Sequence, residues 1–442
     1  MKIGIVKPPG GGIIKAVASK SQAHRMLICA ALSGSDTYIE CGEESDDINA
    51  TIGCLKSLGA GIRYDGGGYE VKPVDIPGST DEIILQRCGD SGSTMRFMLP
   101  VCCALGVTAE FAMSPQLSKR PINSLTDQLS AHSCVFETRA YDPVVLGLGR
   151  APSANTLLCS GQLTGGVFTL PGDISSQYIS GLLFALPLLG GDSKINVTGR
   201  LESEPYVDMT VDTLDLFGVK VERETNDNGG LTYIVTGGQK YVSPGKTTVE
   251  GDWSNAAFWL CSAALGGSGV ICSNLDRYSR QGDKEIVDIL ERFGAVVAYK
   301  SDSVAVRPSR LRSIRIDAAN TPDLVPVLSV VAAAAQGQTV IYNAERLRLK
   351  ESDRLRTTRE ALTALGADII ETSDGLIING RPSLKGGTVS SCGDHRIAMM
   401  AAIASVVCED TVAIRDAEAV NKSYPRFFED FVKLGGEIVE GM

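Results

Sequence analysis

The stretch GDSGSTMRFMLPVCCAL at residues 89–105 decides the fold, because it is one of six copies of the same pattern. A polar start, often Gly-Asp, precedes a helix of small apolar residues, and the pattern recurs at 19–32, 172–189, 251–265, 321–335 and 393–407. Consecutive starts are 70 to 83 residues apart. This period exceeds that of ordinary solenoid repeats, so we expect a few bulky packed units instead of a long stack.

Each copy continues into a second, more amphipathic helix that ends at a Gly and runs into a strand. These segments lie at 54–64, 213–224, 289–300, 361–372 and 431–440, and the remaining copy, 128–137, is degenerate. Gly just past a helix is the usual left-handed stop. The first helix of each copy is apolar nearly all round, which indicates burial on every side. We therefore expect helices inside and sheets outside.

The chain length predicts two domains, because single hydrophobic cores stop growing near roughly 250–300 residues. Three repeats per domain is the natural division of the 442 residues. The last repeat stops after one strand, so the N-terminal strand is expected to complete the C-terminal domain. We expect an N-terminal domain at 15–243, a C-terminal domain at 1–14 plus 244–442, and crossings near 14–20 and 241–248 that permit domain closure.

Composition excludes several kinds of partner and cofactor. A net charge of −10 disfavours nucleic acid and anionic membranes. The longest apolar run, 323–335, is shorter than the ~20 residues that cross a bilayer, and without a signal or transit segment we expect a cytoplasmic protein. The three His and twelve Cys show none of the sequence spacings typical of metal ligands, so we expect no metal site. We expect the cysteines to be reduced thiols in the core. Phosphate-loop and dinucleotide motifs are absent, so no nucleotide cofactor is expected.

Cations at helix starts are the feature that points to chemistry. A cation there costs roughly 0.3–1 kcal/mol against the helix dipole, whereas a bound anion returns ~1.5–3 kcal/mol per charge-assisted hydrogen bond. Solvated surface charges and helix caps are the simpler interpretation of any single residue. The candidates at helix starts and nearby loops are Lys20, Ser21, Arg25, Gly92, Ser93, Arg96, Arg120, Ser175, Ser176, Gln177, Arg354, His395, Arg396 and Lys422.

Two acidic residues could take part in proton transfer. Asp323 follows Pro322 in the first turn of a predicted helix, where the dipole alone would select an acid. Glu351 could likewise be a solvated helix start. Spacing alone therefore leaves a capping role and a catalytic role open for both.

Together, the segments SKSQAHR, GDSGSTMR, SKRPI, DISSQY, SEPY, LKESDR, GDHRIAM and NKSYP make the chain resemble, end to end, the 5-enolpyruvylshikimate-3-phosphate synthase family. The resemblance implies a two-domain inside-out α/β barrel, or prism, with three repeats per domain. It implies transfer of the enolpyruvyl group of phosphoenolpyruvate to the 5-hydroxyl of shikimate 3-phosphate, with release of phosphate. No cofactor, no metal and a monomer are further implications.

The resemblance also implies roles for individual residues. Asp323 would accept the hydroxyl proton, Glu351 would protonate the methylene carbon, and Lys20 would share in proton transfer. Contacts to shikimate 3-phosphate would come from Lys20, Ser21, Arg25, Ser175, Ser176, Gln177, Ser203, Tyr206, Asp323 and Lys350. Contacts to phosphoenolpyruvate would come from Lys20, Gly92, Arg120, Gln177, Arg354, Arg396 and Lys422.

Some positions depart from the best-known bacterial form of the family. Where that form has Asn, Thr, Pro and Lys, this chain has Asp90, Ser93, Phe97 and Glu204. The segment YNAERLRLKES is two residues longer, which makes Asn343 and Arg346 alternative candidates for one substrate contact; Asp90, Ser93, Arg96 and His395 are further candidates.

Three other functions are alternatives. One is UDP-N-acetylglucosamine enolpyruvyl transfer, whose reactive Cys is missing from MSPQLSKRPI; the others are an RNA 3′-phosphate cyclase-like activity and non-catalytic metabolite binding.

Overall fold

The computed structural model describes residues 1–42, 44–75, 82–141, 154–225 and 230–441. The chain divides into two compact units: a split unit of residues 1–19 and 250–442, and a continuous unit of residues 20–249. The expected limits at 14/15 and 243/244 are therefore corrected to 19/20 and 249/250. The reason is strand pairing: β2 (Gly12–Lys15) pairs with β15 (Val270–Ser273) in the split unit, whereas β14 (Lys246–Thr248) pairs with β3 (Thr37–Glu40) in the continuous unit.

Within the described residues, each unit holds three four-stranded sheets, and every sheet combines one parallel pair with two antiparallel pairs. The sheets of the continuous unit are β14-β3-β5-β4, β6-β7-β9-β8 and β10-β11-β13-β12. Their further bounds are β4 (Gly61–Tyr64), β5 (Gly68–Lys72), β6 (Ile84–Gly89), β7 (Ala109–Met113), β8 (Val135–Tyr141), β9 (Ala154–Ser160), β10 (Val167–Pro171), β11 (Ser193–Thr198), β12 (Glu222–Thr225) and β13 (Leu231–Val235).

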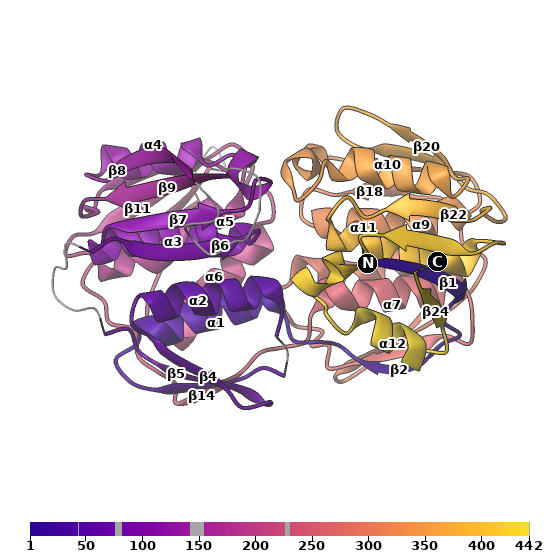
Figure 1. Ribbon diagram of the computed structural model, residues 1–442, viewed down its shortest axis with the longest axis horizontal. Coiled ribbons are helices and arrows are strands. Elements are labelled where there is room, and N and C mark those ends of the chain that lie inside the picture. Colours follow the sequence, from indigo (N-terminus) through magenta and orange to yellow (C-terminus); the bar gives the residue numbers. More distant parts are fainter. Residues whose placement is uncertain (43, 76–81, 142–153, 226–229, 442) are drawn as a thin grey trace. The chain divides into compact units, whose positions relative to one another are not determined.

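The sheets of the split unit are β16-β17-β15-β2, β18-β19-β21-β20 and β22-β23-β1-β24. The N-terminal strand β1 (Lys2–Lys7) lies between β23 (Val412–Arg415) and β24 (Glu437–Glu440), far from it in sequence (Figure 1). The other bounds are β16 (Val296–Lys300), β17 (Ser303–Arg307), β18 (Arg315–Asp317), β19 (Gln338–Tyr342), β20 (Asp368–Glu371), β21 (Leu376–Asn379) and β22 (Gly387–Ser390).

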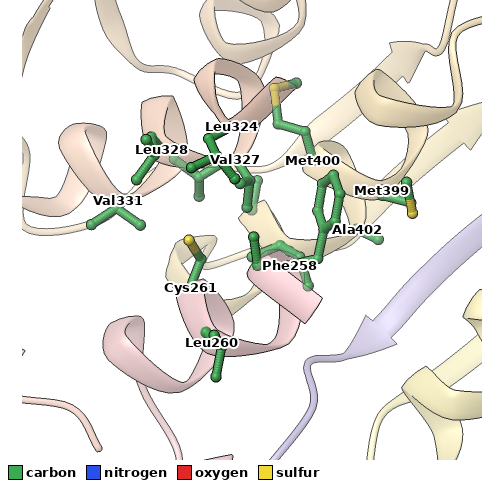
Figure 2. Packing of buried hydrophobic residues seen from close by; sticks show 14 of the residues in the cluster. Phe258, Leu260, Cys261, Leu324, Val327, Leu328, Val331, Met399, Met400 and Ala402 are labelled. Atoms are coloured by element: carbon green, nitrogen blue, oxygen red, sulfur yellow. The ribbon is translucent and has the colours of Figure 1, made fainter. Parts of the chain in front are cut away.

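The first helix of each repeat is almost entirely buried, as its all-round apolar sequence predicts. These helices are α1 (Lys20–Leu32), α3 (Gly92–Leu105), α5 (Ser176–Ala185), α7 (Trp253–Leu265), α9 (Val325–Ala334) and α11 (His395–Ala404). In the split unit α7, α9 and α11 contact one another. Figure 2 shows side chains of all three, including Phe258, Val327 and Met400, gathered in this core. The predicted α/β fold is confirmed.

The second helices are α2 (Asp46–Ser57), α4 (Asn123–Ala131), α6 (Glu204–Leu216), α8 (Ile286–Phe293), α10 (Arg354–Ala364) and α12 (Phe427–Lys433). Five of them are followed by a Gly with positive φ, such as Gly294 at 103°. After α4, the degenerate copy, Ser133 takes this place with φ of 77°. The left-handed conformation costs a non-Gly residue about 1–2 kcal/mol, so the repeat geometry is kept there against the local preference.

The two chain crossings lie side by side. The Ser19 amide donates to the Glu250 carbonyl and the Asp252 amide donates to the Val17 carbonyl, both at 2.8 Å, and Ala18 forms an antiparallel bridge with Gly251. A Cβ at Gly251 would lie 1.7 Å from the Asn274 carbonyl oxygen, so this repeat start requires glycine. No helix in the described part of the chain is long and apolar enough to cross a membrane.

Candidate active site

Asp323, itself half-buried, lies at the centre of an ion-pair cluster in the split unit whose Arg354 and Asp394 are buried. It sits in the 3-10 turn Pro322–Leu324 that leads into α9, and the residue before that turn makes no side-chain cap. Its carboxylate accepts hydrogen bonds from Arg354 Nη1 at 2.7 Å and from Arg396 Nη2 at 2.9 Å. The Asp323 carboxylate therefore takes part in two ion pairs in the first turn of this helix start, and its role in proton transfer stays a prediction.

Arg354, the first residue of α10, joins the two candidate proton-transfer acids. Its side chain is 2% exposed and also donates to Glu351 Oε2 at 2.6 Å and to Asp394 Oδ2 at 2.7 Å. Burial alone would lower the pKa of Arg354, but Asp394, Glu351 and Asp323 outweigh that effect and raise it. One permanently charged guanidinium thus holds Asp323 and Glu351 in a fixed relation.

Asp394 belongs to the site, although its sequence position marks it only as part of the Gly-Asp start of a helix. It is fully buried, accepts from the Arg396 amide at 3.0 Å as the N-cap of α11, and accepts from Ser352 Oγ at 3.0 Å. Because Asp394 also binds Arg354, a single carboxylate positions both candidate anion-binding arginines. The Asp that recurs in the Gly-Asp helix starts is the sequence signal that could have identified Asp394.

The charges around Asp323 determine which groups are ionised. Burial alone would raise the pKa of Asp323, but Arg396, Lys350 and Arg354 outweigh it and hold that pKa far below its usual range. Burial lowers the pKa of Lys350 to about 8, although Asp323 opposes the change. Lys422 Nζ lies 4.0 Å from Glu351 Oε1. The cluster thus offers an ionised proton acceptor beside a lysine that titrates near neutral pH.

The remaining candidates of the split unit lie around this cluster. His395 is buried, with Nδ1 3.6 Å from Asp394 Oδ1. Arg346 lies close enough to Lys350 to lower its pKa. Asn343 has a left-handed backbone, φ 56°, and its amide donates to Asp374 Oδ2 at 3.3 Å. Asn343 and Arg346 both stay candidates for the substrate contact.

Arg25, in the continuous unit, is buried and held by neighbouring polar groups. It donates to Thr210 Oγ1 at 2.8 Å, to the Ser21 carbonyl at 2.6 Å and to the Tyr206 carbonyl at 2.8 Å. Its guanidinium lies 5.1 Å from the centre of the Phe97 ring. Desolvation by burial lowers the pKa of Arg25 to about 10, so it remains a cation at neutral pH.

The positive charge of Lys20, at the start of α1, is balanced by Asp47, which is not among the candidates chosen from the sequence. Its ammonium lies 2.7 Å from Asp47 Oδ2, and the Asp47 side chain is only 6% exposed. Asp47 occupies the first turn of α2 after the N-cap Ser45. A nearby carboxylate, and not only a bound anion, therefore offsets the unfavourable dipole position of Lys20.

A chain of polar side chains joins the starts of α3 and α5. Arg96 Nη1 donates to Gln177 Oε1, and Gln177 Nε2 donates to Ser93 Oγ, both at 2.8 Å. Ser175 caps α5 by accepting from the Gln177 amide at 3.3 Å, and the next residue, Ser176, is buried in the first turn. The structure thus brings the predicted residues of 93–96 and 175–177 together.

Gly92 begins α3 against the guanidinium groups of Arg120 and Arg96. A Cβ at this position would lie 2.8 Å from Nη1 of each, closer than real Cβ contacts. Because Gly92 has no side chain, it leaves room for the guanidinium groups of Arg120 and Arg96.

Asp90, Phe97 and Glu204, which differ from the best-known bacterial form of the family, each have identified neighbours in the structure. Asp90 accepts from Ser114 Oγ at 2.7 Å. Phe97 is buried and packs edge-to-face on Phe184 with ring centres 5.4 Å apart. Glu204 follows Ser203, whose backbone is left-handed at φ 54°, and pairs with Arg223.

The cysteines and the possible metal ligands were compared with the positions expected from sequence in the part of the chain that the structure describes. All twelve cysteines are free thiols and ten are buried, whereas Cys392 is exposed and Cys408 half-buried, which corrects the expectation of core positions for these two. Within the described ranges, no three His, Cys, Asp or Glu side chains are grouped so that they could hold a metal ion.

Comparison with known proteins gives one consistent family. The model of EPSP synthase (3-phosphoshikimate 1-carboxyvinyltransferase) matches residues 9–431. The 3-phosphoshikimate 1-carboxyvinyltransferases of Clostridium kluyveri and Clostridium acetobutylicum are each 42% identical over 432 residues, covering 97% of this chain and 96% of the relative. The structure of EPSP synthase from Acinetobacter baumannii superimposes with a TM-score of 0.78 at 25% identity, covering 99% of this chain and 100% of that one.

Proposed function

The chain belongs to the EPSP synthase family, and from this premise we propose that it transfers the enolpyruvyl group of phosphoenolpyruvate to the 5-hydroxyl of shikimate 3-phosphate. The observation that carries the proposal is the buried cluster in which Arg354 holds Asp323 and Glu351. A protein that only binds a metabolite has no need of two acids fixed in this way. The named relatives, similar over nearly their whole length, support the same activity.

Proton transfer is the part of the reaction assigned to this cluster. Protonated Glu351 gives its proton to the methylene carbon of phosphoenolpyruvate, the 5-hydroxyl oxygen adds to carbon 2, and Asp323 accepts the hydroxyl proton. In the second half, the new methyl group returns a proton to Glu351, the carbon–oxygen bond to phosphate breaks, and the hydroxyl proton held by Asp323 passes to the departing phosphate, so both acids end as they began. The lowered pKa of Asp323 keeps it ionised before the addition. Lys422, close to Glu351, and Lys20 are proposed to share these transfers.

Substrate binding is assigned by charge and hydrogen-bonding chemistry. Each substrate carries several negative charges, and cations with oriented donors stabilise them throughout the reaction. We assign shikimate 3-phosphate to Lys20, Ser21, Arg25, Ser175, Ser176, Gln177, Ser203, Tyr206, Asp323 and Lys350. We assign phosphoenolpyruvate to Lys20, Gly92, Arg120, Gln177, Arg354, Arg396 and Lys422.

We also propose an oligomeric state and a cellular location for the enzyme. A monomer acting on two small phosphorylated metabolites in the cytoplasm is consistent with the net charge of −10, which disfavours nucleic acid and anionic membranes as partners.

A two-substrate phosphate-release assay tests the function. We expect phosphate only when shikimate 3-phosphate and phosphoenolpyruvate are both present, and formation of the enolpyruvyl ether should equal phosphate formed. Release with UDP-N-acetylglucosamine in place of shikimate 3-phosphate would favour the sister activity. Binding of either substrate without any release would return the chain to the class of non-catalytic binding proteins.

A further inference from the structure

Asp47 is a buried acid that the proposed mechanism does not use, and it contacts a lysine that the mechanism does use. It lies in the first turn of α2, and its side chain is 6% exposed. The Lys20 ammonium donates to Asp47 Oδ2 at 2.7 Å, and the Lys20 side chain is half-buried. Burying a charge is costly unless it is paired, so each of these residues compensates the other.

The helix dipole alone does not explain why Asp47 is an acid. Acids are favoured in the first turn of a helix, because they face the positive end of its dipole. Asp46 already occupies this turn of α2 at an exposed position, where an acid keeps its hydration. Asp47 places a second negative charge in the same turn at a buried position. Burial therefore separates the two acids, and the buried one is the partner of the Lys20 ammonium.

A chain of buried polar side chains fixes the part of α2 that carries Asp47. His24 Nδ1 of α1 lies 2.8 Å from Thr51 Oγ1 of α2, and Thr51 Oγ1 lies 2.7 Å from Thr94 Oγ1 of α3. Thr94 Oγ1 also lies 2.7 Å from Ser91 Oγ, the N-cap of α3, and 3.4 Å from the Asp47 carbonyl oxygen. All four of these side chains are buried. The start of α2 is thus tied to both α1 and α3, which leaves Asp47 little freedom to move.

We infer that Asp47 is a positioning residue of the proposed reaction, which holds the Lys20 ammonium in one place. A lysine ammonium is a point charge on a flexible four-carbon stem, and a fixed carboxylate restricts it to conformations that keep the 2.7 Å contact. An ammonium group has three donor hydrogens, so a contact with Asp47 does not prevent it from also donating to an anionic substrate. The inference rests on the proposed function, because that function assigns Lys20 a part in substrate binding and proton transfer.

The first test compares kcat and KM of Asp47→Asn with those of wild type and of Asp46→Asn, an exposed control in the same turn. We expect kcat of Asp47→Asn to fall by about 10- to 100-fold, as when a reacting group is misplaced by about an ångström. KM for the two anionic substrates should stay level or fall, because a negative charge beside Lys20 is gone. Asp46→Asn should keep the wild-type kcat. An unchanged kcat in Asp47→Asn, or a rise of KM alone, overturns the inference.

A double-mutant cycle tests whether Asp47 acts through Lys20. Lys20→Met has no ammonium to position, so adding Asp47→Asn to it should lower the remaining kcat by less than about twofold, the usual limit of additivity. A residue that only supports the fold of α2 would instead lower kcat by the same factor in both backgrounds. A loss in Lys20→Met as large as the loss in wild type therefore overturns the inference, because Asp47 would then act on a group other than Lys20.

Thermal stability of the same four proteins separates this inference from the proposed function. Each single variant removes one charge of the pair and leaves the other away from solvent, which is destabilising, whereas the double variant removes both charges. We expect both single variants to have a lower Tm than wild type, and the double variant to lose less than the sum of the two losses. If the wild-type chain releases no phosphate with either acceptor, the proposed function fails, while this Tm pattern still decides whether Asp47 holds Lys20. Additive Tm losses overturn the inference.

Discussion

Replacing Gly92 with Ala should weaken phosphoenolpyruvate binding without damaging the fold. The added Cβ would lie 2.8 Å from Nη1 of Arg120 and of Arg96, and 3.1 Å from Cζ of Arg120. Ordinary contacts begin near 3.4 Å, so one or both guanidinium groups must shift by several tenths of an ångström. The φ of Gly92 is not in the left-handed region, so the backbone accepts alanine.

The magnitude follows from what the arginines would lose. A displaced charge-assisted hydrogen bond costs roughly 1.5–3 kcal/mol, which corresponds to about ten- to a hundredfold in KM for phosphoenolpyruvate. Stability should be unchanged or higher by up to about 1 kcal/mol, because alanine is a better helix former than glycine. KM for shikimate 3-phosphate should change much less.

The assay is phosphate release at varied phosphoenolpyruvate, with Tm measured on the same samples. Gly53→Ala is the matched control, because Gly53 lies in α2, is exposed, and has nothing within 4 Å of its added Cβ. It should gain stability and keep both KM values. An unchanged KM for phosphoenolpyruvate in Gly92→Ala, or an equal change in Gly53→Ala, would refute the argument.

Two further predictions concern the charged cluster. Asp323→Ala should still bind shikimate 3-phosphate through the other residues assigned to it, measured by calorimetry, but lose about 10²–10⁴-fold in kcat as expected for a lost general base; unchanged turnover would deny Asp323 that role. Because the folded-state pKa of Lys350 is lowered to about 8, shikimate 3-phosphate should bind more weakly to wild type above pH 8, and Lys350→Met should lack this decline. The same shift means that the unfolded chain binds more protons between about pH 8 and 10.5, so wild-type stability should rise with pH there relative to Lys350→Met; parallel Tm curves would contradict the assignment.

Local chemistry made the repeats predictable. Helices apolar on every side, such as 395–404, had to be buried, and a Gly after each second helix marked the stop. The degenerate copy at 128–137 still formed a helix, with Ser133 in the left-handed position. What could not be predicted is that β2 pairs with β15 and β14 with β3, because strand pairing depends on contacts distant in sequence.

The candidate site was predictable as a set of residue types and not as a network. Sequence pointed to Asp323, Glu351 and Arg354, but gave no reason to expect that one guanidinium would hold both acids. Asp47 and Asp394 were missed because a helix-start Asp is ordinarily a cap or a solvated charge. Their burial and their cationic or hydroxyl partners are tertiary properties.

The pairing of the two crossings has a practical consequence for building the protein in pieces. Residues 20–249 form one uninterrupted segment, and the Ser19 amide and Glu250 carbonyl on either side of it are only 2.8 Å apart. The gene can therefore be recut into two separate coding sequences: 20–249 alone, and 1–19 joined by a short linker to 250–442. Each product would retain its own three sheets, so either half could be isotope-labelled or exchanged for that of a relative while the other is left untouched.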